Sequence, residues 1–334
     1  MLNYILRRLV MLIPVLLGVS ILAFALIHLI PGDPARSMLG EKASEEQLEQ
    51  LRKDMGLTDP YIVQYGRFIG NVVTGDFGTS IKSNDSVLSE ISHRLPATLE
   101  LTIFAMGLAI IVGVLAGVIA AVKQYSWFDN ISMTGALFGL SMPIFWLGLM
   151  MIWLFSVTLH WFPPSGRLAD TVELTTITNM YMLDSVLTGN WKALQDSFVH
   201  LLMPGIALGT IPMAIIARMT RSSMLEVMKQ DYIRTANAKG LATKLVIFQH
   251  ALKNAFLPVL TVIGLQFGFL LGGAVLTETI FSWPGIGRYV LLAVLGRDYP
   301  VVQGSILIIA IIFVLVNLFT DILYKYIDPR IRYD

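Results

Sequence analysis

The amino-acid sequence predicts an all-α polytopic membrane protein that crosses the lipid bilayer six times. Hydrophobic residues make up 55% of the 334 residues and charged residues only 14%, whereas a soluble domain carries roughly 25% charged residues. So few charges cannot cover a surface that faces water. The apolar residues are gathered into six long runs, and a helix of about 20 apolar residues spans the hydrocarbon core.

The first run, 9–30, follows two arginines and is expected to be an uncleaved membrane helix. A secretory signal peptide also starts with basic residues, but its apolar region has about 7–15 residues and precedes a small-residue cleavage site. Here the run is longer and ends in Pro-Gly-Asp-Pro at 31–34. We therefore assign 1–30 to the N-terminus and the first span.

Five further spans are expected from the remaining apolar runs, at 96–122, 131–159, 198–219, 255–281 and 301–326. Prolines inside these runs are tolerated, because neighbouring membrane helices can satisfy the freed backbone groups. Gly113 and Gly117 form a small-xxx-small pattern, which suits close packing of two helices.

The positions of lysine and arginine predict that both termini are cytoplasmic. Basic residues in short flanking segments favour the cytoplasmic side. They precede the first span, occur in the link at 123–130, dominate 220–253 and recur in the tail 327–334. In a six-span arrangement these segments share one side, which leaves 31–95 outside.

The external segment 31–95 is expected to contain short helices. Ser44 and Gln47 fit a capping box, and Gly56 is placed to end that helix. A second helix with one apolar face is predicted to start with Pro60 at its first helical position. That face consists of Tyr65, Phe68 and Val72.

The segment 220–253 is predicted to form two short amphipathic helices joined at Gly240, with Thr243 placed to cap the second. The predicted apolar faces are Leu225, Met228, Tyr232 and Ala236 on the first helix and Leu245, Phe248 and Leu252 on the second. Two functions are open at this point. The basic outer face can hold the segment on anionic lipid, or the helices can dock into a groove of a soluble partner.

Two stretches in and after this segment resemble the cytoplasmic signature of binding-protein-dependent ABC importer permeases, in particular the dipeptide and oligopeptide branch. They are Asp-Tyr-Ile-Arg-Thr-Ala-Asn-Ala-Lys-Gly-Leu at 231–241 and His-Ala-Leu-Lys-Asn-Ala-Phe-Leu-Pro at 250–258. The sequence departs from the general pattern at Arg234, where that pattern has Glu, and in the late position of Leu257-Pro258. The peptide branch shares both departures.

Further stretches resemble the same family in the same order along the chain. They are His-Leu-Ile-Pro-Gly-Asp-Pro at 28–34, Gly-Asp-Phe-Gly-Thr-Ser at 75–80, and the pair 278–288 and 297–303 between the last two spans. The resemblance covers essentially the whole chain. It implies the type I ABC importer permease fold, with 96–326 as the transmembrane domain.

The resemblance also implies a function and a set of partners. Such a protein is a pore-forming permease subunit in the bacterial inner membrane, for dipeptides or short oligopeptides, or alternatively for glutathione, nickel or a haem precursor. Its implied partners are a homologous second permease, two ATP-binding subunits, an extracytoplasmic substrate-binding protein and membrane lipid. An ion-coupled secondary transporter and a membrane-embedded enzyme are the alternative classes, and neither explains the signature at 231–241.

The resemblance implies that 231–241 is a coupling helix that seats on an ATP-binding subunit. The expected contact residues are Tyr232, Arg234, Thr235, Ala236, Lys239, Gly240 and Leu241. Separately, polar residues inside membrane spans are costly and tend to mark transport pathways. Gln266 and Asn317 are therefore pathway candidates, with interhelical hydrogen bonding as the alternative, and Glu278 is a third at the external end of its span.

Enzyme chemistry is not expected in this chain. It has no Gly-x-x-x-x-Gly-Lys-Ser/Thr phosphate loop and no His-Glu-x-x-His motif, the patterns that hold nucleotide phosphates and zinc. It has no cysteine, which excludes disulfides and thiolate metal sites. The net charge of +1 gives no bias toward nucleic acid. We expect no catalytic residue, metal site or cofactor here, and the resemblance places ATP and Mg²⁺ in the partner ATPases.

Overall fold

The computed structural model describes residues 2–29, 33–40, 43–54 and 56–327. Over these ranges the chain is helical, with loops and turns between the helices and an isolated β-bridge between Thr79 and Ser86. The all-α class predicted from the sequence is confirmed. In the predicted tail, 328–334 lies outside the described residues.

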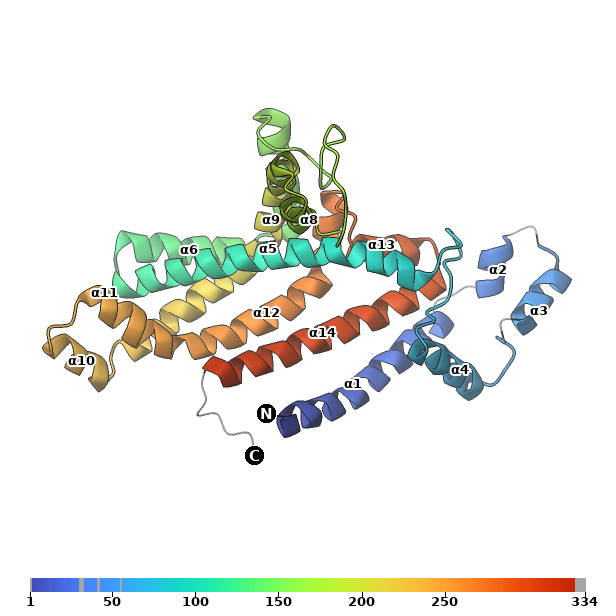
Figure 1. Ribbon diagram of the computed structural model, residues 1–334, viewed down its shortest axis with the longest axis horizontal. Helices are drawn as coiled ribbons and strands as arrows, with labels where there is room; N and C mark the ends of the chain where they lie inside the picture. Colours follow the sequence, from blue (N-terminus) through green and yellow to red (C-terminus); the bar gives the residue numbers. More distant parts are fainter. Residues whose placement is uncertain (1, 30–32, 41–42, 55, 328–334) are drawn as a thin grey trace. The chain divides into compact units, whose positions relative to one another are not determined.

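The chain forms two compact units. The first combines 1–96 with 285–315, and the second combines 97–284 with 316–334. Two long helices contribute to both units, α5 (Val87–Val122) and α14 (Tyr299–Ile327). Figure 1 shows the helices with their labels.

Among the residues that the structure describes, up to five helical stretches can cross a membrane, against six predicted crossings. Four stretches are long and apolar enough to cross a membrane. They are α5, α9 (Trp191–Val227), Thr243–Gly272, which runs through α11 (Thr243–Leu245) and a π-helical stretch into α12 (Lys253–Ile280), and Tyr299–Phe319 of α14. A bent helix pair is the fifth candidate. The first predicted run lies in α1 (Leu2–Leu29), whose apolar part, Val10–Ala25, is shorter than the candidate spans.

The third predicted span, 131–159, is broken at Pro143. Helix α6 (Trp127–Ser141) stops there, and α7 (Ile144–Met151) continues as a π-helical stretch over Ile152–Thr158. The two halves are bent by 104°. Proline pushes the residue before it out of the helical region, and Met142 accordingly has an extended backbone with φ −82° and ψ 126°.

The core of the second unit is built around α9, which packs against α5, α6, α12 and α8 (Tyr181–Leu187). Gly113 and Gly117 of α5 face α9 at very short range. A Cβ atom on Gly117 would lie 2.6 Å from the backbone oxygen of Ala217. Only glycine fits at that distance, so the predicted small-residue helix contact is confirmed.

The first unit contains the two predicted short helices, α3 (Glu45–Asp54) and α4 (Tyr61–Val73), and a further one that the sequence does not predict, α2 (Pro34–Leu39). The capping box is confirmed at α3, because Ser44 N–H donates to Gln47 Oε1 at 3.1 Å and Gln47 N–H to Ser44 Oγ at 3.3 Å. Tyr65 and Phe68 of α4 pack on Phe24 of α1, with ring centroids 5.5 and 6.0 Å away.

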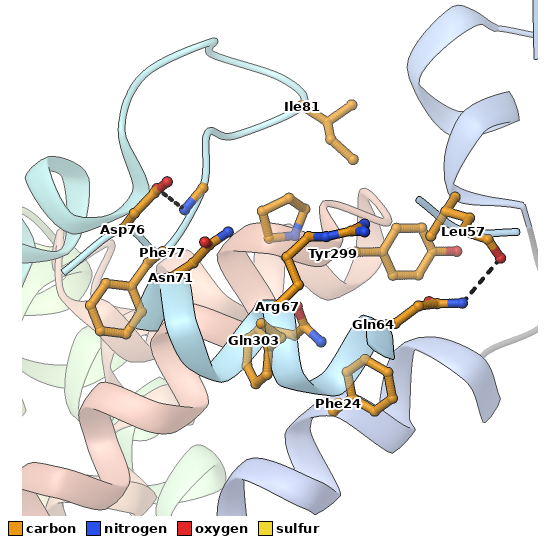
Figure 2. A pocket seen from close by; sticks show the side chains of 13 residues that line it. Phe24, Leu57, Gln64, Arg67, Asn71, Asp76, Phe77, Ile81, Tyr299 and Gln303 are labelled. Atoms are coloured by element: carbon orange, nitrogen blue, oxygen red, sulfur yellow. Dashed lines mark hydrogen bonds between the residues drawn. The ribbon is translucent and has the colours of Figure 1, made fainter. Parts of the chain in front are cut away.

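A cavity of about 270 Å³ lies beside this aromatic contact, between α1, α4, the loop 76–81 and the first turn of α14. Figure 2 shows the side chains that line it. The loop is tied to Asp298, whose carboxylate accepts from the Ser80 hydroxyl at 2.6 Å and from the Ile81 N–H at 3.2 Å. One wall of the cavity is thereby fixed within the first unit.

Asp33 ties α2 to α3 in the same unit. Its carboxylate accepts from the Ala35 N–H at 3.1 Å, and from Arg52 Nη2 and Nε at 2.5 and 3.0 Å. Burial raises the pKa of Asp33, but the hydrogen bonds from Arg52 and Ala35 and the charge of Arg52 together outweigh burial. The net pKa of Asp33 therefore lies below its usual value.

Candidate functional site

The segment that carries the family signature forms a short helix, α10 (Asp231–Ala238), followed by a turn. The residue before it, Gln230, has extended backbone angles, and Gly240 after it adopts a φ of +75°. Residues with a Cβ rarely adopt that left-handed conformation. Gly240 therefore ends the helix, as the sequence predicts.

Two side chains anchor α10 to the bundle. Ile233 and Ala236 are 3% and 6% exposed, and their spacing of three residues puts them on one face of the helix. They pack with residues at the ends of three long helices and of the following π-helical segment. The other buried members of this cluster are Val118, Ala121, Met224, Val246, Ala251 and Ala255. Figure 1 shows α10 at the ends of α9 and α12.

The remaining residues of α10 and of the turn after it are exposed. Tyr232 is 43% and Leu241 38% exposed, and the side chains of Asp231 and Arg234 are 95% and 76% exposed. The predicted coupling residues on this outer surface are Tyr232, Arg234, Thr235, Lys239, Gly240 and Leu241. Ala236 lies on the inner side, so it can fix the helix but not contact a partner directly.

Two local predictions for this segment are wrong. Tyr232 is exposed and Ile233 takes the buried position instead, because α9 ends at Val227 and α10 starts afresh after Gln230, which resets the helical phase. Thr243 does not cap the next helix, which begins at Thr243 itself without a side-chain capping hydrogen bond.

The predicted apolar face of the second helix is confirmed at Leu252, which packs against the buried cluster that anchors α10, and is wrong at Phe248. Phe248 is 51% exposed, whereas Val246 and Ala251 are buried. Residues 246–252 are π-helical, and a π-helix bonds each residue to the fifth one along the chain. The two buried positions of this stretch, Val246 and Ala251, are accordingly five residues apart.

Arg221 links α9 to α6 near the same end of the second unit. Its Nε and Nη2 donate to the two carboxylate oxygens of Asp129 at 2.6 and 2.7 Å, and Asp129 is 2% exposed. Paired bonds of this kind are strong and directional. No local sequence pattern indicates the pair, since 92 residues separate its members.

The three pathway candidates occupy different environments. Gln266 of α12 and Asn317 of α14 are partly exposed. Glu278 is fully buried, and the Thr98 hydroxyl donates to its Oε1 at 2.5 Å. A role for these residues in a transport pathway stays a prediction.

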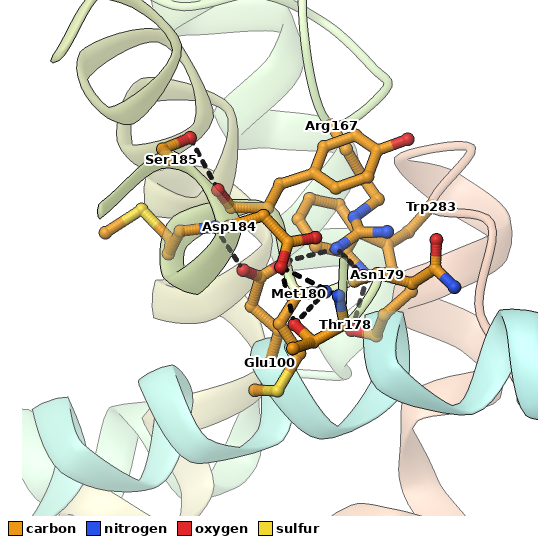
Figure 3. A network of polar contacts seen from close by, with 11 residues as sticks. Glu100, Arg167, Thr178, Asn179, Met180, Asp184, Ser185 and Trp283 are labelled. Carbon is orange, nitrogen blue, oxygen red and sulfur yellow. Dashed lines mark hydrogen bonds and ion pairs between the residues drawn. The ribbon is translucent and has the colours of Figure 1, made fainter. Parts of the chain in front are cut away.

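A buried polar network, which sequence patterns do not indicate, holds the loop before α8 against α5 (Figure 3). Arg167 and Glu100 are 6% and 5% exposed, and Arg167 Nη2 lies 2.5 Å from Glu100 Oε2. The same nitrogen donates to the backbone oxygen of Asn179 at 2.8 Å, and the second oxygen of Glu100 accepts from the Met182 N–H at 2.6 Å.

Aromatic rings close this network on two sides. The guanidinium carbon of Arg167 lies 3.7 Å from the centroid of the Tyr181 ring and 5.3 Å from that of Trp283. Trp283 is 1% exposed and donates from Nε1 to the backbone oxygen of Ala97 at 2.8 Å. The family-like stretch 278–288 thus supplies a structural anchor through its tryptophan. Among the residues that the structure describes, no group of three or more His, Asp or Glu side chains is placed to hold a metal ion.

Comparison with protein families matches nearly the whole chain. The family described as "Binding-protein-dependent transport system inner membrane component" matches 113–333, and the N-terminal family of such membrane components matches 1–102.

Individual relatives extend over the full length. The dipeptide transport system permease protein DppB of Alkalihalophilus pseudofirmus is 58% identical over 100% of both chains. The di/tripeptide transport system permease protein DppB of Pseudomonas aeruginosa is 52% identical over 100% of this chain and 99% of that protein. The glutathione transport system permease protein GsiC of Escherichia coli is 43% identical over 100% of both.

Among solved structures, one of an amino acid ABC transporter aligns with a TM-score of 0.47 and 14% identity, over 73% of this chain and 94% of that one. That similarity is too weak to carry an argument. The family matches and the full-length relatives suffice: the chain belongs to the family of inner membrane components of binding-protein-dependent transport systems.

Proposed function

We propose that this chain is a pore-forming permease subunit of an ATP-driven importer that moves dipeptides or short oligopeptides across the bacterial inner membrane. The support for peptide as substrate is the full-length identity of 58% and 52% with permeases of dipeptide and di/tripeptide transport systems. The support for transport is family membership together with the apolar helices.

The importer needs partners, because the chain lacks a phosphate-binding loop. Two ATP-binding subunits supply the energy, with ATP and Mg²⁺ bound there. A homologous second permease completes the pore, and an extracytoplasmic binding protein delivers the peptide. In the proposed cycle the binding protein first delivers the peptide, and the pore then carries it across. The pore alternates between an outward-open and an inward-open state.

The observation that carries the proposed mechanism is the exposure of α10. Its two buried side chains, Ile233 and Ala236, pack on the ends of the membrane helices, while Tyr232 and Arg234 face outward. A partner that moves α10 therefore moves those helices with it, since a close-packed contact has little compressibility. In this proposal α10 is the coupling helix, and a lipid-anchoring role alone leaves its exposed tyrosine and glycine turn without a function.

The orientation follows from the same proposal. Both termini and α10 lie in the cytoplasm, and α2–α4 lie outside. A cysteine placed at Asn237, an exposed position of α10, is expected to react with a membrane-impermeant reagent only in inverted vesicles. Labelling in intact cells overturns the orientation and with it the coupling role.

Transport is tested with the complete importer in proteoliposomes. Uptake of a labelled dipeptide is expected to require ATP, Mg²⁺ and the binding protein, and to be independent of an imposed ion gradient. Uptake driven by the gradient alone identifies a secondary transporter and overturns the proposal. Arg234→Glu is expected to reduce uptake about tenfold or more, whereas the matched reversal Lys192→Glu, at an exposed position at the other end of α9, leaves it unchanged.

Glutathione is a second candidate substrate, because the glutathione permease of Escherichia coli is 43% identical over the whole chain. Competition separates the two. Under the peptide proposal, excess dipeptide suppresses uptake of the labelled dipeptide and excess glutathione does not. The opposite pattern transfers the assignment to glutathione, and suppression by Ni²⁺ or haem indicates the remaining alternatives.

A further inference from the structure

The cavity of the first unit is assembled from segments far apart in the sequence. Its walls come from α1, α4, the loop 76–81 and the start of α14, all of which belong to the same compact unit. Its volume of about 270 Å³ lies just below the range for ligand pockets, roughly 300–1,000 Å³. That volume suits an amino acid or a dipeptide.

The floor of the cavity is largely aromatic and apolar. Its apolar lining residues are Phe24, Leu57, Phe68, Phe77, Ile81, Tyr299 and Pro300. Such a surface favours an apolar or aromatic side chain, because burial of apolar area is the main attraction in small-ligand sites.

One buried polar group in this floor has no partner. Tyr299 is 3% exposed, and its hydroxyl makes no hydrogen bond within the part of the chain that the structure describes. An unsatisfied buried hydroxyl costs free energy, which a ligand that supplies the missing hydrogen bond recovers. Figure 2 shows the Tyr299 ring among the lining side chains.

The lining also carries one charge of each sign. Arg67 donates through Nη2 to Asp59 Oδ2 at 2.8 Å, and among the described residues its other guanidinium N–H groups make no further hydrogen bond. Asp76 accepts the Gly78 N–H on Oδ1 at 2.8 Å, and its Oδ2 accepts none from the described residues. Arg67 and Asp76 form no ion pair with each other among the described residues. The largely apolar cavity is therefore lined by both a guanidinium group and a carboxylate.

We propose that this cavity is a binding site for a small zwitterion with an apolar side chain. Arg67 meets the carboxylate of the ligand, Asp76 its ammonium group, and the aromatic floor its side chain. The choice of a dipeptide as the ligand rests on the proposed function. The permease then holds substrate on its own first unit, in addition to any site on the binding protein.

The experiment uses the full-length chain in detergent without binding protein or nucleotide. Equilibrium dialysis measures binding of radiolabelled leucyl-alanine, with the N-acetylated and C-amidated form of the same dipeptide as the competitor lacking both charges. Saturable binding at one site per chain is expected, and the blocked dipeptide is not expected to compete.

Three variants test the three contacts. Arg67→Gln and Asp76→Asn each remove a charge and are expected to weaken binding about tenfold, since a charge-assisted hydrogen bond is roughly twice as strong as a neutral one. Tyr299→Phe keeps the ring and is expected to weaken it about threefold. Lys53→Gln, an exposed residue of α3 that does not line the cavity, is the matched control and is expected to bind normally.

Several outcomes overturn the proposal. They are the absence of saturable binding to the natural chain, equal competition by the blocked dipeptide, and unchanged affinity in all three cavity variants. If Arg67→Gln or Asp76→Asn does not fold, the dipeptide affinity of Tyr299→Phe is the deciding measurement, because this variant leaves the ring in place. If the binding experiment fails while ATP-dependent dipeptide uptake is intact, only the proposed binding site is ruled out. If uptake itself fails, the proposed function is ruled out.

Discussion

Arg167 and Glu100 form an ion pair that is almost completely withdrawn from water, with both side chains about 5% exposed and 2.5 Å between Nη2 and Oε2. The pair joins the loop before α8 to α5 within the second unit. Burial of two charges is costly, and the attraction between them offsets that cost only while both partners are present.

Removal of one partner is therefore expected to cost more than removal of both. Arg167→Met leaves Glu100 as an uncompensated buried charge, and a loss of about 3–5 kcal/mol is expected. The double variant Arg167→Met with Glu100→Gln is expected to recover a substantial part of this loss. Unfolding in detergent, followed as a double-mutant cycle, measures the coupling, and strictly additive effects contradict the prediction.

Two glycines of α5 provide a matched test of the contact with α9. A Cβ on Gly117 meets the Ala217 oxygen at 2.6 Å, whereas a Cβ on Gly107 has nothing within 4 Å. Gly117→Ala is expected to destabilise the protein by about 1–3 kcal/mol through overpacking. Gly107→Ala, in the same helix, is expected to be neutral or stabilising, by up to about 1 kcal/mol. Equal effects on the unfolding temperature in detergent rule out the close approach.

Two substitutions in the turn after α10 can distinguish the effect of backbone strain from the effect of an added charge. Gly240 has a φ of +75° and open space around its Cβ position, and both Asn and Asp tolerate that backbone better than other residues. Under the proposed coupling role, Gly240→Asp is expected to uncouple ATP hydrolysis from uptake without loss of membrane insertion, because it places a negative charge beside the exposed face of α10. Gly240→Asn, of the same shape, is expected to keep most of the coupling. Uptake and ATPase rates of the reconstituted complex measure both, and unchanged uptake by Gly240→Asp speaks against docking at this turn.

The contact between Asp33 and Arg52 predicts a pH dependence in the first unit. The pKa of Asp33 is lowered in the folded protein relative to an unfolded value of about 3.9. Its stabilising contribution is therefore complete above that pH and is lost as the pH falls through the lower, folded pKa. Hydrogen exchange of α2 and α3, corrected for the intrinsic rate, is expected to accelerate below about pH 4. In Asp33→Asn this acceleration is expected to be absent, and its persistence there assigns it to other groups.

Features with a local cause were predictable from the sequence. The capping box at Ser44 and Gln47 requires only neighbouring residues. The close approach at Gly117 is indicated by the four-residue spacing of Gly113 and Gly117. The family signature at 231–241 placed α10 and the turn at Gly240 correctly. The capping box and the turn depend on interactions within a few residues of chain, whereas the glycine spacing marks a helix face that another helix can approach closely.

Features without a local cause were missed. The Arg167–Glu100 pair joins residues that are 67 positions apart, and the Asp129–Arg221 pair spans 92. The π-helical stretch 246–252 changes the period of burial, although its residues look compatible with an ordinary helix. The bend at Pro143 was not predicted, because the sequence is apolar on both sides of it and membrane helices often accept proline without breaking.

The scarcity of anchors in α10 has an evolutionary consequence. Of the residues of α10, Ile233 and Ala236 belong to the buried cluster and the others are exposed, so selection for folding constrains the others little. Under the proposed coupling role, these exposed positions can vary together with the surface of the ATPase that they contact. A permease can then exchange its ATPase by changing a few surface residues, while its membrane helices, and hence its substrate, stay the same.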